Sequence, residues 1–340
     1  IQKKLINYFL KKLEKNPYLH DKVEFEILFT CYDFTLKKRM EDLINYGFTR
    51  TEIKIIKNQL IDFTNELIKK TPDILKQTVS FLKILEDKRK ESRDKISDYK
   101  SKLSNAETLL KNCKKYGVVQ FTAVARLAFI ANILLKGLTE ISNIKKLEID
   151  KFMNSISTPV TEFQNDLYNL EIKKITKADF LDKYGHLRPG TYDITIERYD
   201  NMSELLDNLK FLHIKKRLKT KKTYQKNIQN IIKKHGLIFK EIDFFDFIRN
   251  TINLREKTKF EFTKSLSDAI ELIAGAGNEL GLTREELANL SLEDIFKYKA
   301  KSKNELKEFW KKSITLNQKN FEISEYVQLP PIIFSENDFD

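Results

Sequence analysis

The sequence predicts a mainly helical protein, a multi-helix domain with a few short strands around residues 22–30 and 191–197. Three observations support this fold class. The 340 residues include only 9 Gly and 6 Pro, whereas all-β and doubly wound folds need many turn residues. Charged residues make up 33% of the chain, with both signs interspersed as on solvated helix faces. The hydrophobic content of 41% is enough for one large core or two ordinary cores.

The amino-terminal part is expected to contain helices and one strand. Residues 3–15 carry Leu and Phe at helical spacing, and Asn16-Pro17 ends this run. Apolar side chains then alternate along residues 23–29, which favours a strand. Thr49 and Glu52 have the spacing of a capping box, and a helix is expected over 53–69.

Two longer helical regions are predicted next. Residues 74–115 are charged and periodic, which indicates one or two helices. Residues 118–138, VVQFTAVARLAFIANILLKGL, are apolar, but four polar side chains that include Arg126 interrupt them. Because central charges are costly in lipid, we expect the core helix of a soluble domain and no membrane anchor.

The chain is expected to have two helical parts and a linker. Residues 1–150 form the first part, which holds the predicted strand near 22–30. Residues 151–325 form the second part and carry both motifs described below. A break at Ser155 to Pro159 places the subdivision near 145–160. Residues 326–340 are interpreted as a linker.

An unusual turn-forming segment, YGHLRPGTYDI, occupies residues 184–194. Its two glycines and its proline favour a non-helical backbone. In such a segment His186 and Arg188 could both point toward one anion, with Tyr192 and Asp193 orienting them. A buried turn whose His and Asp satisfy backbone groups explains the same residues equally well.

A second motif, LREKTKFEFTKSLSDAIELI, covers residues 254–273 with strong helical periodicity. Arg255 and Lys259 are four residues apart and share a face, while Glu256 lies beside Arg255 and three residues before Lys259. Two cations and one carboxylate at a helix start can clamp a phosphate and orient a second group. An ordinary charged helix face has the same spacing, and the residues alone favour that alternative.

Other candidate sites are weaker. His20, Lys22 and Arg126 are further candidate substrate-binding residues. No metal site is expected, because the chain has only four His and no HExxH pattern. The glycines of GAGNELG, residues 275–281, follow a helix and not a strand, so they predict a helix end and no dinucleotide loop. The sequence contains no P-loop and no GxSxG motif.

The net charge of +13 would suit a nucleic acid, a membrane surface or an anionic substrate, but a general bias toward Lys explains it as well. Residues 208–240 contain no Asp or Glu. An exposed helix is favoured there over a nucleic-acid-binding one, because aromatic residues are not interleaved with the lysines. Two cysteines without CxxC spacing, and no signal peptide, predict a cytoplasmic protein.

Four segments in order resemble the central region of phosphoenolpyruvate-synthase-like phosphotransferases: LHDKVEFEILFTCYDF, YGVVQFTAVARLAFIANILL, FLDKYGHLRPGTYDI and LREKTKFEFTKSLS. They cover most of residues 18–300, and the final YVQLPPIIFSENDFD looks like the lead-in to the phosphohistidine domain. In that family an ATP-grasp domain uses ATP and Mg²⁺ to phosphorylate a mobile histidine, which carries the phosphoryl group to a helical acceptor domain. The chain begins at Ile1, which suggests an excised piece.

The resemblance implies that this chain is the acceptor-binding middle domain. It would hold no cofactor itself and would be inactive alone. Its partners would be a small-molecule acceptor and the ATP-grasp and phosphohistidine domains of the same polypeptide, with no nucleic acid and no membrane. The resemblance is nearest to capsule-pathway L-glutamine kinases, which act on the side-chain amide of L-glutamine. Rifampin phosphotransferases share the architecture.

The acceptor domains of rifampin phosphotransferases carry Arg-Glu followed three residues later by Lys, which matches Arg255, Glu256 and Lys259. The resemblance implies that the two cations neutralise the transferring phosphoryl group, while Glu256 orients the acceptor and takes its proton. The segment 184–194 would line the cleft. The alternatives are another acceptor, such as an antibiotic or pyruvate, and a basic helical module that binds nucleic acid.

Overall fold

The computed structural model describes residues 1–92, 96–142, 146–190, 192–202, 225–299, 301–333 and 335–339. Nearly all regular structure in these residues is helical, and they contain no β-strand. The predicted mainly α fold is therefore confirmed.

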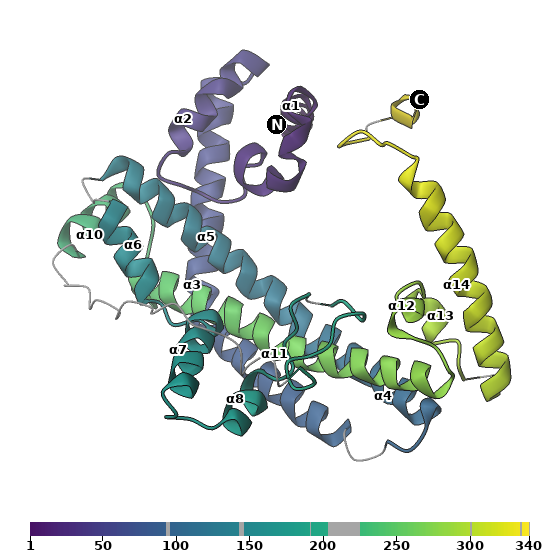
Figure 1. Cartoon of the computed structure of the whole chain (residues 1–340). Coiled ribbons are helices and arrows are strands. Elements are labelled where there is room, and N and C mark those ends of the chain that lie inside the picture. Colours follow the sequence, from purple (N-terminus) through teal and green to yellow (C-terminus); the bar gives the residue numbers. More distant parts are fainter. Residues whose placement is uncertain are drawn as a thin grey trace.

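Three long helices organise the molecule: α3 (Arg50–Glu91), α5 (Val119–Ile141) and α11 (Phe244–Glu279). They pack against one another, and α4 (Tyr99–Asn112) lies along the carboxyl-terminal half of α11 (Figure 1). A six-residue π-helix, η5 (Cys113–Val118), joins α4 to α5. The predicted helices over 53–69, 74–115 and 118–138 are thus confirmed.

The long helix α3 begins at the predicted capping box. The Thr49 hydroxyl accepts a hydrogen bond from the Glu52 amide, and the Glu52 carboxylate accepts one from the Thr49 amide at 2.8 Å. Both atoms satisfy backbone donors that a helix start otherwise leaves open. The helix then continues for 42 residues with Pro72 inside it, so the expected helix over 53–69 is the first part of a longer one.

Two large hydrophobic cores share α11. The first core takes buried side chains from the amino-terminal half of the chain and from later segments: α1 (Gln2–Lys15), α2 (Leu36–Glu41), α3, α5, α6 (Lys146–Ser155), α10 (Gln225–Lys234) and the start of α11. The second core joins α4 and the end of α11 to three helices: α12 (Arg284–Leu287), α13 (Leu292–Ile295) and α14 (Lys303–Glu325). The predicted division near 145–160 stays a prediction, since the first core contains residues from both sides of it.

Two shorter helices form a third, smaller cluster that positions the candidate site. α7 (Pro159–Glu171) and α8 (Lys177–Tyr184) pack together through Leu167, Phe180 and Tyr184, and this cluster also contacts Phe260 of α11.

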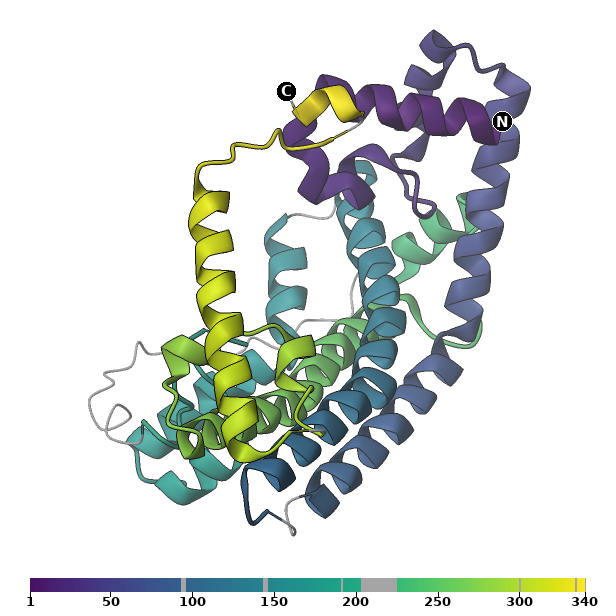
Figure 2. The same ribbon diagram turned by 90° about the vertical axis from the view of Figure 1, so that its right-hand side faces the viewer.

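α14 lies on the other side of the molecule from α3 (Figure 2).

The predicted strand around residues 22–30 is wrong. The chain forms a 3₁₀-helix, η1 (Pro17–Lys22), and a π-helical turn, η2 (Val23–Ile27). A strand needs a partner for its backbone groups. Here the Arg39 guanidinium takes that place, because it donates to the carbonyl oxygens of Phe25 and Leu28 at 3.3 and 3.0 Å.

The second predicted strand, 191–197, is also wrong for its described residues, 192–197. In this segment, arginine guanidinium groups donate hydrogen bonds to the backbone carbonyl oxygens that a neighbouring strand would otherwise bind. Arg188 donates to the carbonyl oxygens of Asp193 and Ile196 at 2.9 and 3.1 Å, and Arg284 donates to that of Ile194 at 2.9 Å. The backbone is therefore satisfied in an irregular conformation.

Two further sequence predictions stay untested. Much of the basic stretch 208–240 lies outside the described residues, which resume at 225. Among the described residues, one helical run, Tyr99–Ile141, is long and apolar enough to cross a membrane, and half of its most apolar window is buried. A buried core helix has the same properties, so the cytoplasmic location remains a prediction.

Candidate functional site

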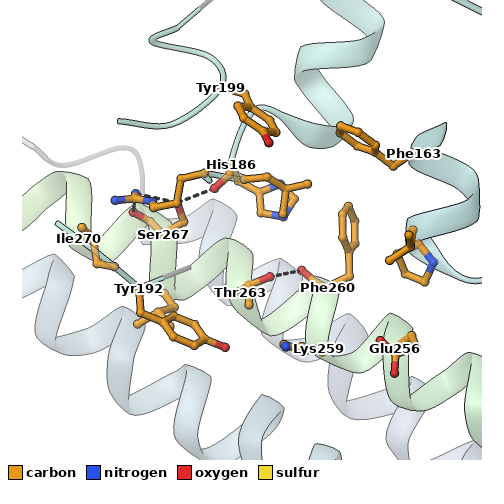
Figure 3. Close-up of a pocket in the computed structure, with 15 residues that line it drawn as sticks. Phe163, His186, Tyr192, Tyr199, Glu256, Lys259, Phe260, Thr263, Ser267 and Ile270 are labelled. Atoms are coloured by element: carbon orange, nitrogen blue, oxygen red, sulfur yellow. Dashed lines mark hydrogen bonds between the residues drawn. The ribbon is translucent and has the colours of Figure 1, made fainter. Parts of the chain in front are cut away.

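A pocket of about 350 Å³ opens between α11, the start of α7 and the segment 186–199 (Figure 3). The α11 residues that line it recur every three or four positions, as on one helix face. They are Glu256, Lys259, Phe260, Thr263, Leu266, Ser267 and Ile270. The predicted periodicity of residues 254–273 thus produces one wall of the pocket.

The other walls come from two distant segments. α7 contributes Pro159, Val160 and Phe163 at its first turns, and the segment 186–199 contributes His186, Leu187, Arg188, Tyr192 and Tyr199. Most of the lining is aromatic or aliphatic, with a few polar groups among them. Small-molecule pockets usually have this composition and a volume of roughly 300–1,000 Å³.

His186 is buried in the pocket wall with only 6% of its surface exposed. Its ring packs edge-on against Phe260 with 4.8 Å between the ring centres. Burial, and then the nearby cations Lys264 and Arg198, lower its pKa from 6.5 to about 3. The ring is therefore neutral at physiological pH and does not supply the cation expected from the sequence.

The two terminal nitrogens of the Arg188 guanidinium are bound to protein groups, whereas its buried Nε atom has no hydrogen-bond partner among the described residues. Besides the two backbone carbonyls of its own turn, it donates at 3.0 Å to the hydroxyl of Ser267 and at 3.0 Å to the carboxylate of Glu271. Its side chain is only 2% exposed. Ser267 in turn donates to the carbonyl oxygen of His186 at 2.6 Å. Arg188 therefore links the turn to α11, and its charge is already paired with the carboxylate of Glu271.

Tyr192 and Asp193 have different places in the turn. Tyr192 lines the pocket and is half exposed. Its backbone has φ of +74°, a conformation that costs energy for a residue with a side chain. The Asp193 carboxylate accepts from the backbone amide and hydroxyl of Thr195 at 2.9 and 2.7 Å. Asp193 thus shapes the turn and lies outside the pocket lining.

The three residues of the predicted motif, Arg255, Glu256 and Lys259, do not all line the pocket. The Arg255 guanidinium pairs with Glu256 and lies over the rings of Phe121 and Phe129 of α5, at 5.8 and 5.9 Å from their centres. Arg255 is not among the lining residues, whereas Glu256 and Lys259 are. Lys259 is exposed and has no ion-pair partner among the described residues.

The remaining predicted residues lie away from the pocket. Arg126 is exposed on α5 and does not line it. His20 and Lys22 belong to η1, directly after α1, at the end of the molecule opposite α7 and α8 (Figure 1). A ring nitrogen of His20 contacts the carbonyl oxygen of Pro17 at 3.1 Å. The structure therefore does not bring these three residues together with the two motifs.

Several lining residues were missed by the sequence analysis. Phe260 and Ser267 lie four and eleven residues after Glu256, so the helical spacing already places them on its face. Phe163 and Tyr199 come from segments with no local signal of a site. Their approach to α11 depends on the tertiary packing of α7 and α8.

The described residues were compared with the requirements of a metal site and of a reactive thiol. It has no cluster of three or more His, Cys, Asp or Glu side chains that could hold a metal ion. Both cysteines are buried, and burial raises the pKa of Cys31 to about 12 and that of Cys113 to about 11. Such thiols stay protonated and are poor nucleophiles.

Comparisons of the chain with family models, with curated proteins and with solved structures find no match. The resemblance to phosphoenolpyruvate-synthase-like phosphotransferases therefore rests on the sequence segments alone.

Proposed function

We propose that this chain is the acceptor-binding part of an ATP-dependent phosphotransferase of the phosphoenolpyruvate-synthase-like type. The observation that supports this most is the placement of Glu256 and Lys259 in the pocket that the segment 184–194 also lines. Two sequence motifs that lie about 70 residues apart, and that share a resemblance to one family, thus contribute to a single small-molecule pocket.

Lys259 is the residue suited to the transferring phosphoryl group. Its ammonium group is exposed at the pocket and has no partner among the described residues, so no existing ion pair must break when an anion arrives. A fixed cation next to developing phosphoryl charge stabilises the transition state. Lys259 would neutralise the phosphoryl oxygens while the acceptor approaches from inside the pocket.

Glu256 would orient the acceptor and take its proton. As the bond between phosphorus and the donor histidine breaks, the acceptor nitrogen or oxygen forms its bond to phosphorus, and its proton passes to the Glu256 carboxylate. The electron pair of the broken bond stays on the histidine nitrogen. Arg255 is a positioning residue here, because it binds Glu256 while the rings of Phe121 and Phe129 hold its guanidinium.

Two acceptors remain candidates within this proposal. L-glutamine is the one that the resemblance implies. The aromatic and aliphatic lining of the pocket favours the alternative, an acceptor with an apolar body bound in the same architecture. The proposal of a nucleic-acid-binding module has less support, because its basic stretch lies largely outside the described residues.

The test is phosphorus NMR on the complete polypeptide that carries this chain, with ATP, Mg²⁺ and candidate acceptors. We expect AMP, phosphate and a phosphorylated acceptor. Lys259→Met should lower the transfer rate by roughly 10²–10³-fold, as for loss of one transition-state donor. Lys257→Met is the matched control, because Lys257 is an exposed lysine of α11 that does not line the pocket.

The control should transfer phosphate at nearly the unmodified rate. Equal rates in the two variants would remove Lys259 from the mechanism. Absence of phosphoryl transfer to L-glutamine, pyruvate and ring-bearing alcohols or amides alike would overturn the proposed function.

A further inference from the structure

Three charged residues line the pocket. Lys259 is exposed and Glu256 is partly exposed, whereas Arg188 is buried. The His186 side chain is also almost fully enclosed. The buried Arg188 guanidinium is bound by Ser267, Glu271 and two backbone carbonyls, and only its Nε atom has no partner among the described residues. The cations near His186 all have carboxylate partners: Arg188 pairs with Glu271, Lys264 with Glu261, and Arg198 with Asp268. A buried anion beside His186 would therefore have to compete with an existing ion pair, which disfavours it.

His186 also has an unused hydrogen-bonding atom. Its Nε2 atom is buried and has no partner among the described residues. More than about 90% of buried polar groups in proteins are hydrogen-bonded, and an unsatisfied one destabilises the fold. Such an atom in the wall of a pocket indicates that a bound molecule provides the missing partner.

The chemistry of that partner follows from the state of the ring. A neutral imidazole has one donor nitrogen and one acceptor nitrogen, and the tautomer decides which of the two carries the proton. An amide or a hydroxyl group can both donate and accept, so it matches either tautomer. A carboxylate only accepts, and the cations near His186 already have carboxylate partners.

Aromatic side chains surround this position (Figure 3). Phe260 packs against the His186 ring, and Phe163 of α7 lies beside Tyr199, with 6.3 Å between their ring centres. Flat apolar faces of this kind bind planar rings by stacking or edge-to-face contact. A small zwitterion such as L-glutamine leaves those faces uncovered.

We infer that the pocket binds an uncharged molecule with a ring, whose amide or hydroxyl group hydrogen-bonds to His186. As a statement about the acceptor, this inference rests on the proposed function. The reacting group of the acceptor then faces Glu256 and Lys259. Binding itself depends only on the pocket and is measurable with this chain alone.

Benzamide and benzoate are the probes for this inference, because they have nearly the same shape and differ in charge. Saturation-transfer NMR and calorimetric titration of the chain should show benzamide binding at least about tenfold more tightly than benzoate, a difference of about 1.4 kcal/mol. L-glutamine and pyruvate should both bind more weakly than benzamide. Equal or tighter binding of benzoate, or no binding of either probe, would overturn the inference.

Two variants test the role of His186. His186→Phe keeps a ring against Phe260 but removes both nitrogens, and it should reduce benzamide affinity to that of benzoate. His186→Gln keeps a donor and an acceptor and should retain most of the preference for the neutral probe. Far-ultraviolet circular dichroism confirms that each variant is folded. An unchanged benzamide affinity in His186→Phe would exclude His186 as the recognition group.

The two proposals fail in different ways. Selective benzamide binding without phosphoryl transfer in the complete polypeptide would keep the pocket assignment and remove the phosphotransferase. Phosphoryl transfer to L-glutamine without selective benzamide binding would keep the phosphotransferase and remove the assignment of an uncharged, ring-bearing ligand.

Discussion

Among single residues, His186 links the stability of the fold to pH. Its pKa is about 3 in the folded protein, compared with 6.5 for an unperturbed histidine, because burial and nearby cations disfavour the charged ring. Below pH 6.5 the unfolded chain therefore binds a proton that the folded chain does not. The stability that His186 contributes is fully present above pH 6.5 and is lost as the pH falls toward 3.

The variant His186→Phe removes this titration and should flatten the pH dependence. Between pH 6.5 and 5, the free energy of unfolding of the unmodified chain should fall by roughly 1 kcal/mol per pH unit more than that of the variant. Urea unfolding at several pH values measures both slopes. The other histidines are present in both proteins, so their contributions cancel. Parallel slopes would show that the folded protein accepts the proton at His186.

The two motifs predicted which segments line a common pocket better than they predicted the contacts of each residue. Glu256 and Lys259 share the pocket because they are three positions apart on one helix, and this spacing can be read from the sequence. Arg188 was predicted to face an anion, but its partners are carbonyl groups and Glu271. Such partners depend on the fold of an irregular turn, which local sequence does not determine.

At the scale of secondary-structure elements, the π-helix η5 lies unusually close to α11. A Cβ atom added at Gly117 would be 2.5 Å from the Cβ atom of Phe262, a distance that real side chains do not adopt. The neighbouring atom is part of the helix backbone region of α11 and cannot rotate away. The absence of a side chain at Gly117 is therefore what permits this helix contact, which encloses Cys113 and Leu85.

Gly117→Ala should therefore destabilise the protein, although alanine is the better helix former. We expect a loss of about 1–3 kcal/mol from overpacking between η5 and α11. Gly275→Ala is the matched control, because its added Cβ would be no closer than 3.5 Å to the flexible side chain of Lys102. That control should gain up to about 1 kcal/mol from helix propensity. Thermal or urea unfolding that ranks the two variants in the opposite order would contradict this account.

Helices were predicted well and strands were not, for a physical reason. Each helical hydrogen bond joins residues four positions apart, so a short stretch of sequence is enough to predict a helix. The capping box of Thr49 and Glu52 is an example. The alternating apolar side chains of residues 23–29 predicted a strand, but the residues that the structure describes include no partner strand. Arg39 binds the carbonyls there instead, and its position depends on how α2 packs.

For the molecule as a whole, α11 connects the two large cores. Phe247 and Ile248 near its start are fully buried in the first core, and Ala269 and Ala276 near its end are fully buried in the second. Loss of either core would expose part of the same continuous helix. We therefore expect the chain to unfold in one cooperative transition, although chains of this length often show more than one.

The single tryptophan makes this expectation testable. Trp310 is fully buried in the second core, whereas Leu36 is fully buried in the first. Leu36→Ala should lower the free energy of unfolding by about 2–5 kcal/mol. If unfolding is cooperative, Trp310 fluorescence and circular dichroism should report the same lowered urea midpoint.

Leu316→Ala is the control for this experiment, because Leu316 lies on α14 with 59% of its surface exposed. It should change the midpoint little, since exposed substitutions usually stay within about 0.5 kcal/mol. A Trp310 transition that Leu36→Ala leaves unchanged, while circular dichroism separates into two steps, would show that the cores unfold independently. In that case α11 would break between the cores. This division would differ from the predicted one near 145–160, because α4 belongs to the second core and α10 to the first.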